Sequence, residues 1–125
     1  DFGTSMNTAV DLGQIEGGIV QGLGWMTMEE VVYDADGRLR SNALSTYKVP
    51  DIYSVPKEIA VLPLETDRDN LAIFNSKAVG EPPLMYGIGA YFAIRNAVKA
   101  YTDCSPKFDC PFTPERVLMN LYSKL

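Results

Sequence analysis

Glycine is unusually frequent in residues 7–28, a segment whose other side chains favour a helix. The glycines are Gly13, Gly17, Gly18, Gly22 and Gly24. Each costs a helix about 1 kcal/mol relative to alanine, and two pairs are spaced by four residues, so each pair shares one helix face. A helix with this composition has a close neighbour at its backbone. The neighbour is either a tightly packed helix or sheet of the same fold or a bulky ligand, and the spacing leaves both interpretations open.

The rest of the pattern predicts two more helices and several short strands. Asn7 is a suitable N-cap for the glycine-rich helix, apolar residues recur at helical spacing from Met85 to Tyr101, and Thr113 followed by Pro114 marks a last helix. The predicted strands cover residues 29–33, a return strand from 39, then 58–64 and 71–74. We therefore expect an α+β fold, a small mixed sheet packed with helices, in one unit over residues 1–125.

Composition excludes several kinds of chemistry. The chain has no histidine and two cysteines, Cys104 and Cys110, so alone it cannot form a Ser-His-Asp triad, a His-ligated zinc site or a four-thiolate iron–sulfur cluster. The net charge is −5 without a cluster of basic residues, which disfavours a nucleic-acid partner. No apolar run reaches the roughly 20 residues that span a bilayer, and no signal peptide is recognised, so we expect reduced thiols and a cytoplasmic location.

Glu81 stands between Gly80 and two prolines in the most unusual stretch of the chain, residues 76–84. Pro82 disfavours the right-handed helical region for Glu81 and predicts an extended backbone there. The prolines stiffen the approach to the following helix, whose dipole favours an ionised carboxylate, and Gly80 leaves room for a large neighbour. This arrangement suits a general base, although an acidic side chain at the start of a helix is also a common surface feature.

Gln14 lies on the glycine-rich helix, and its amide can both donate to and accept from a ligand with mixed polar edges. An exposed glutamine without a ligand is the alternative. Lys77, four residues before Glu81, either pairs with it or faces solvent. Trp25 and Met26 are expected in the apolar core.

Together these stretches resemble the C-terminal part of the molybdenum-binding subunit in the xanthine dehydrogenase branch of the molybdenum hydroxylase family. The resemblance covers nearly the whole chain in order. The matching stretches are residues 11–18, 20–25, 29–30, 45–50, 77–84 and 113–116. The Lys-Ala-Val-Gly-Glu-Pro-Pro stretch is highly specific for the wider family, and Ser-Thr-Tyr-Lys favours the xanthine dehydrogenase branch.

The resemblance implies a role for three residues. Glu81 would be the catalytic general base, Gln14 would contact the pyranopterin of a molybdenum–molybdopterin cofactor, and Gly80 would lie against the metal centre. The metal is held by the sulfur atoms of the pterin, so no residue of this chain is expected to ligate molybdenum. The chain would form the C-terminal segment of a larger molybdopterin-binding domain.

The implied reaction is the oxidative hydroxylation of a purine, hypoxanthine or xanthine, with oxygen derived from water. The alternatives are an aldehyde, nicotinate or another N-heterocycle as substrate, or a non-catalytic assembly domain with the same fold. The partners would be the remaining molybdenum-binding region and the iron–sulfur and FAD domains or subunits of a hetero-oligomer. Because the chain starts at Asp1 and lacks those regions, we expect a fragment that is inactive alone and presents an apolar face to a larger subunit.

Overall fold

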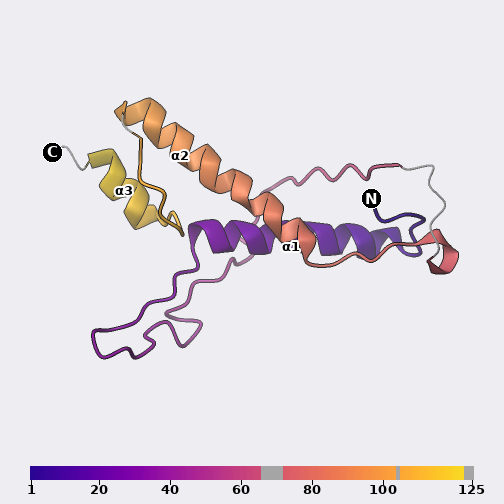
Figure 1. Ribbon diagram of the computed structural model, residues 1–125, viewed down its shortest axis with the longest axis horizontal. Coiled ribbons are helices and arrows are strands. Elements are labelled where there is room, and N and C mark those ends of the chain that lie inside the picture. The colour runs from indigo at the N-terminus through magenta and orange to yellow at the C-terminus, as the bar shows by residue number, and fades with distance from the viewer. Residues whose placement is uncertain (66–71, 104, 123–125) are drawn as a thin grey trace.

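The helices of the chain are α1 (Thr8–Thr27), α2 (Ile88–Thr102) and α3 (Pro114–Tyr122), with two short 3-10 helices, η1 (Ile73–Asn75) and η2 (Pro82–Gly87). The structure is a computed structural model that describes residues 1–65, 72–103 and 105–122. Figure 1 shows α2 crossing α1 near the start of α2, with α3 beside the outer half of α2. The three predicted helices are confirmed, although α2 begins three residues later than expected because η2 precedes it.

Helix α1 begins where the sequence predicts. The Asn7 side chain accepts a hydrogen bond of 3.2 Å from the Val10 N–H and so satisfies one free donor of the first turn. Asp11 follows in the first turn, where a negative charge interacts favourably with the helix dipole. Helix α3 is capped similarly, since the Arg116 N–H donates to the Thr113 hydroxyl at 3.3 Å.

A small apolar core lies where the end of α1 meets α2 and α3. Its buried members are Tyr91, Val98 and Phe112, and partly buried Met26, Ile94, Val117 and Leu121 pack against them. The Phe112 N–H donates to the Met26 carbonyl at 2.7 Å, which ties the segment before α3 to the end of α1. Met26 therefore joins the core as expected, whereas the prediction for Trp25 is wrong, because its side chain is 53% exposed.

The predicted small mixed sheet is not found in the part of the chain that the structure describes, which contains two isolated antiparallel bridges, Gly3 to Ser76 and Tyr33 to Leu39. The hairpin forms only near its tip, where the Arg40 N–H donates to the Val32 carbonyl at 2.7 Å. Residues 58–64 are extended without a β-bridge. Residues 73 and 74 of the last predicted strand lie in η1 instead, and residue 71 lies outside the described residues. A ladder needs a neighbouring strand, and these segments have none here.

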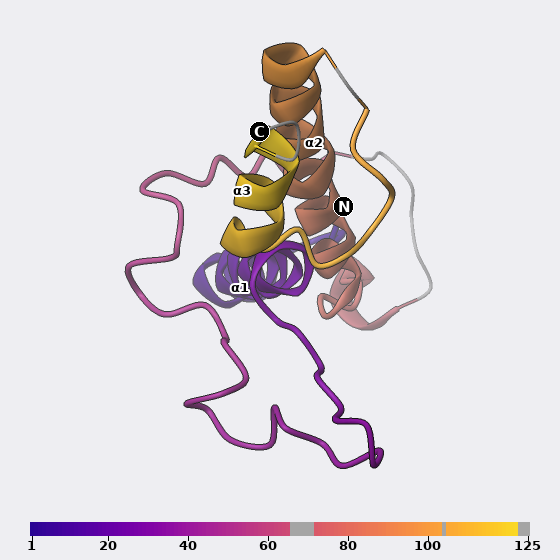
Figure 2. The same cartoon turned by 90° about the vertical axis from the view of Figure 1, so that its left-hand side faces the viewer.

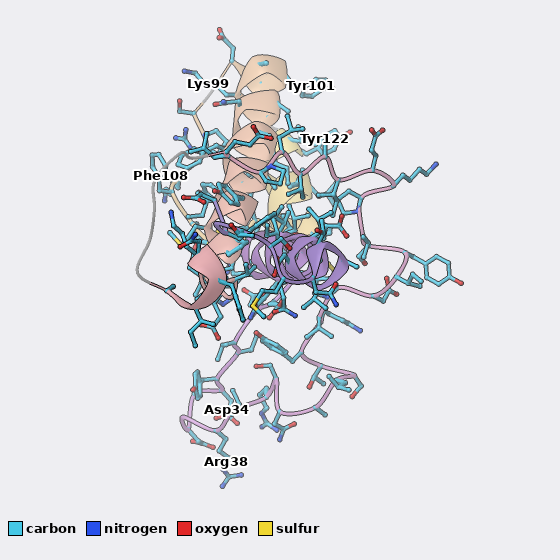
Figure 3. The ribbon with its side chains drawn as sticks, turned by 90° about the vertical axis from the view of Figure 1, so that its right-hand side faces the viewer. Asp34, Arg38, Lys99, Tyr101, Phe108 and Tyr122 are labelled. Atoms are coloured by element: carbon cyan, nitrogen blue, oxygen red, sulfur yellow. The ribbon has the colours of Figure 1, made fainter. Side chains whose placement is uncertain are left out.

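Residues 29–65 form an extended arm. Figures 1 and 2 show the arm leaving the end of α1, swinging away from the helices and returning past α1. Figure 3 shows Asp34 and Arg38 at the tip of the arm, far from Lys99 and Tyr101 on the outer end of α2. Many apolar side chains of the arm are exposed, with Tyr53 and Leu62 each 92% exposed.

None of the helices in the described residues is long and apolar enough to cross a membrane.

Candidate active site

Glu81 is the residue immediately before η2. Its backbone has φ −66° and ψ −27°, so the predicted extended conformation is wrong. The Glu81 carbonyl accepts a hydrogen bond of 2.9 Å from the Leu84 N–H, and this first turn requires helical torsion angles at Glu81. Pro82 and Pro83 occupy positions where no N–H is needed, and their rings stiffen the turn. The Glu81 side chain is exposed.

The segment before Glu81 is held by the first residues of the chain. The Lys77 N–H donates to the Phe2 carbonyl and the Thr4 N–H donates to the Asn75 carbonyl, both at 2.9 Å. The Lys77 ammonium forms an ion pair with the Asp1 carboxylate. Of the two predicted alternatives for Lys77, pairing with Glu81 or facing solvent, neither describes this contact. No local pattern signals it, since the partners are 76 residues apart in the sequence.

Helix α1 supports η2 from the other side through backbone contact. A Cβ atom built on Gly22 would lie 2.9 Å from the carbonyl carbon of Leu84 and closer still to its oxygen. A Cβ atom on Gly18 would lie 3.0 Å from Cβ of Pro83. Tight packing therefore explains these two glycines. It does not explain Gly13 and Gly17, where an added Cβ would meet nothing within 4 Å among the described atoms.

A cavity of about 470 Å³ opens beside this junction. Its lining is mostly apolar and comes from the N-terminus, α1, the returning arm and the segment around Gly80. The lining residues are Asp1, Phe2, Ile15, Ile19, Ala60, Val61, Leu62, Pro63, Ala78, Val79, Gly80, Pro82, Pro83 and Tyr86. This volume lies within the range that is usual for small-molecule and cofactor pockets.

The three predicted site residues stand in different relations to this cavity. Gly80 lines it, and a Cβ atom on Gly80 would meet nothing within 4 Å. Glu81 is not among the lining residues, but its neighbours Gly80 and Pro82 are. Gln14 is exposed and lies one helical turn before Gly18, the glycine that contacts Pro83. Ile15, the residue after Gln14, lines the cavity. Gln14 and Glu81 thus belong to the two elements that meet at the cavity.

A second polar contact lies at the base of the arm. The Tyr47 hydroxyl donates a hydrogen bond of 2.5 Å to Oε2 of Glu29. This hydrogen bond, together with burial and the negative charge of Glu29, raises the pKa of Tyr47. Both residues lie in stretches that carry the family resemblance, residues 29–30 and 45–50, but nothing in the sequence pattern predicts their pairing.

Within the described residues, no group of three or more His, Cys, Asp or Glu side chains is placed to hold a metal ion. Cys110 is a free thiol, and burial raises its pKa. Cys104 lies outside the described residues.

Comparison with known proteins identifies the relatives of this chain. Residues 1–56 match the family described as molybdopterin cofactor-binding domain. The xanthine dehydrogenase/oxidase of Mus musculus is 44% identical over 125 residues, which cover 94% of this chain and 9% of the relative. The xanthine dehydrogenase of Dictyostelium discoideum is 48% identical over 100 residues, covering 80% of this chain and 7% of the relative.

The fold also matches a solved structure, quinoline 2-oxidoreductase from Pseudomonas putida 86, with a TM-score of 0.81 and 34% identity. The match covers 97% of this chain and 15% of that chain. The chain therefore spans less than a tenth of the length of the mouse and slime-mould relatives. In sequence and in fold the chain is therefore similar to one segment of the xanthine dehydrogenases and of quinoline 2-oxidoreductase, and its residues 1–56 match the molybdopterin cofactor-binding domain family.

Proposed function

We propose that this chain contributes the general base, Glu81, and part of the cofactor-binding surface to a molybdenum hydroxylase that hydroxylates a purine, hypoxanthine or xanthine. The observation that carries the proposal is the position of Glu81 on a stiff turn. That turn is held between α1 and the N-terminal segment, next to a cavity lined by Gly80. A carboxylate fixed in this way can accept a proton with little reorganisation.

The residues around the cavity fit a molybdenum–molybdopterin cofactor. The open space beside Gly80 admits a large group where a side chain would intrude, and the exposed Gln14 amide offers a donor and an acceptor for the polar edge of a pterin. The resemblance assigns the metal ligands to the sulfur atoms of the pterin, so the chain needs no metal-ligating cluster of its own. When bound, this cofactor supplies the redox centre that takes the electrons of the substrate.

The chemical task of Glu81 is proton transfer. We expect a carboxylate oxygen of Glu81 to take the proton from the water-derived hydroxyl whose oxygen enters the product. Gly80, the residue before Glu81, lines the cavity, and a Cβ atom there would meet nothing within 4 Å, so this side of the turn is open to a large group.

The relatives named xanthine dehydrogenase favour a purine substrate. The name of the bacterial structural neighbour, a quinoline oxidoreductase, favours another N-heterocycle as the second candidate. Steady-state assays with xanthine, nicotinate, quinoline and an aldehyde distinguish these substrates. Faster turnover of a substrate other than a purine would contradict the purine assignment and leave the proposed role of Glu81 untouched.

The proposed partners are the remaining molybdenum-binding region and domains or subunits that carry iron–sulfur clusters and FAD, in the cytoplasm. The small fraction of each relative that this chain spans supports this proposal. The exposed apolar side chains of the arm, residues 29–65, also support it, because large exposed apolar surfaces are uncommon on monomers. The chain alone should be inactive.

Glu81→Gln in the complete enzyme tests the proposal. The amide keeps the size of the side chain but cannot act as a base, so we expect turnover per bound molybdenum to be nearly abolished while cofactor content persists. Glu115→Gln is the matched control, since Glu115 is an exposed glutamate at the start of α3. Turnover of Glu81→Gln equal to that of the control would overturn the assignment.

A further inference from the structure

Two glycines that are far apart in the sequence touch where η2 ends and crosses α1. A Cβ atom on Gly87 would lie 2.5 Å from Cα of Gly22 and from the backbone nitrogen of Leu23. A Cβ atom on Gly22 would lie 2.9 Å from the carbonyl carbon of Leu84 and 3.1 Å from Cα of Gly87. These neighbours are backbone atoms, so no rotation of a side chain can relieve the overlap. Any side chain at either position must move η2 away from α1.

The requirement for glycine is local to this crossing. Gly89 lies two residues beyond Gly87 in the first turn of α2, and a Cβ atom there would meet nothing within 4 Å. Gly18, one turn before Gly22 on α1, is intermediate, because its Cβ would lie 3.0 Å from Cβ of Pro83. The three positions thus form a graded series of disturbance, from none at Gly89 through moderate at Gly18 to severe at Gly87.

A displacement at this crossing is transmitted to Glu81. Leu84 touches Gly22, and the Leu84 N–H donates a hydrogen bond of 2.9 Å to the Glu81 carbonyl. The contact with α1 is therefore one hydrogen bond away from Glu81. Pro82 and Pro83, between them, have fixed φ angles and cannot absorb a shift by turning about those bonds. The upstream side is also held, through the Lys77 N–H bond to the Phe2 carbonyl.

We propose that Gly22 and Gly87 are positioning residues for Glu81. Their backbone contact sets the separation of η2 from α1 and thereby the place of the Glu81 carboxylate relative to the cavity. This inference rests on the proposed role of Glu81 as general base. A displacement of about 1 Å of a catalytic group can reduce a rate by a factor on the order of 100, so methyl-sized changes at these glycines affect the chemical step.

The test compares Gly87→Ala, Gly18→Ala and Gly89→Ala in the complete enzyme, each measured for molybdenum content, kcat per bound molybdenum and KM. Gly87→Ala should lower kcat per molybdenum by a factor on the order of 100 with KM unchanged. Gly18→Ala should lower it less, and Gly89→Ala should leave it unchanged. If Gly87→Ala does not fold, kcat per molybdenum of Gly18→Ala still tests the inference. This variant should fold, because its added Cβ atom overlaps only slightly with the ring of Pro83.

A merely structural role gives a different result. It would lower the yield of folded, molybdenum-loaded enzyme in Gly87→Ala and Gly18→Ala but leave kcat per molybdenum at the value of Gly89→Ala, and this outcome would overturn the inference. A rise in KM without a fall in kcat would overturn it too. Glu81→Gln in the same assay separates the two proposals. Full turnover of this variant would reject Glu81 as the general base. An inactive Glu81→Gln together with normal kcat in Gly87→Ala and Gly18→Ala would reject only the positioning role of Gly22 and Gly87.

Discussion

The hydroxyl of Tyr47 donates a 2.5 Å hydrogen bond to the carboxylate of Glu29, and this contact closes the first part of the arm back onto the end of α1. Glu29 follows Met28, the C-cap residue of α1, and its N–H donates to the Gly24 carbonyl at 2.9 Å. Pro50, three residues after Tyr47, packs against Gly24. The long excursion between Glu29 and Pro50 therefore has a fixed base although its tip is exposed.

Tyr47→Phe should destabilise the chain. A hydrogen bond to a charged partner contributes about 1.5–3 kcal/mol, and we expect a loss near the lower end of that range because Tyr47 is only half-buried. Urea denaturation of the purified chain measures this loss. Tyr53→Phe is the control, since that side chain is 92% exposed and its hydroxyl should be dispensable. Equal stability of the two variants would show that the bond to Glu29 does not hold the arm.

The same bond makes stability depend on pH in the alkaline range. The hydrogen bond to Glu29 and burial raise the pKa of Tyr47 in the folded chain. Because the folded chain holds this proton more tightly than the unfolded chain, the stabilisation is complete below the usual tyrosine pKa of about 10. It is lost as the pH rises through the higher folded-state pKa. Denaturation measured on both sides of pH 10 should show a difference between wild type and Tyr47→Phe that shrinks with increasing pH, and a constant difference would contradict this linkage.

Alanine at two glycines of α1 should have opposite effects on stability. A Cβ atom on Gly24 would lie 2.5 Å from Oε1 of Glu29 and closer still to the ring of Pro50, so Gly24→Ala should cost about 1–3 kcal/mol through overpacking. Gly17→Ala meets nothing within 4 Å and should stabilise the isolated chain by up to about 1 kcal/mol through helix propensity. Urea midpoints that move in the same direction for both variants would refute the distinction.

The helices could be predicted from the sequence because their signals are local. Asn7 and Thr113 cap α1 and α3 as their positions indicate. The sheet could not, because an apolar pattern over residues 58–64 shows that a segment prefers burial but not whether a neighbouring strand lies within the same chain. For Glu81, the steric preference of a residue before proline was outweighed by the hydrogen bond from Leu84.

The candidate site was accessible from the sequence only in part. The motif around Gly80 and Glu81 indicated a segment of which Gly80 lines the cavity, and the roles predicted for Gly80, Glu81 and Gln14 stay predictions. The ion pair of Lys77 with Asp1 and the contact of Gly22 with Gly87 depend on how distant segments meet. The ion pair has no signature in the spacing of nearby residues, and the glycine spacing predicts a close neighbour for α1 without identifying it as Gly87.

Loss of the Lys77 charge should loosen the segment that leads to Glu81. The side chains of Lys77 and Asp1 are 35% and 20% exposed, so the ion pair contributes at most about 1 kcal/mol. Lys77→Gln should therefore speed hydrogen exchange at the amides of Lys77 and Thr4, whose bonds join the two segments, with little change in global stability. Lys77→Arg should restore protection. Unchanged exchange in Lys77→Gln would mean that the backbone bonds alone hold the segment.

Arg116 joins α3 to the base of the arm and to the segment before α3. Its guanidinium donates to the Pro111 carbonyl at 2.8 Å, to Oδ1 of Asp109 at 3.2 Å and to Oε1 of Glu30 at 2.5 Å. Lysine has a single ammonium group and cannot reproduce these three directed bonds. Arg116→Lys should therefore destabilise the chain nearly as much as Arg116→Gln.

A double-mutant cycle with Glu30→Gln isolates the contact between α3 and the arm. The two residues share one short ion pair that is partly shielded from solvent, so the double variant should lose less stability than the sum of the single variants, with a coupling of about 0.5–1 kcal/mol. Arg38→Gln, at the tip of the arm, provides the independent site, and its effect should add to that of Arg116→Gln. Additivity in both cycles would show that Glu30 and Arg116 do not stabilise the junction together, and that α3 is held by the apolar core and by the bonds of the Arg116 guanidinium to Pro111 and Asp109.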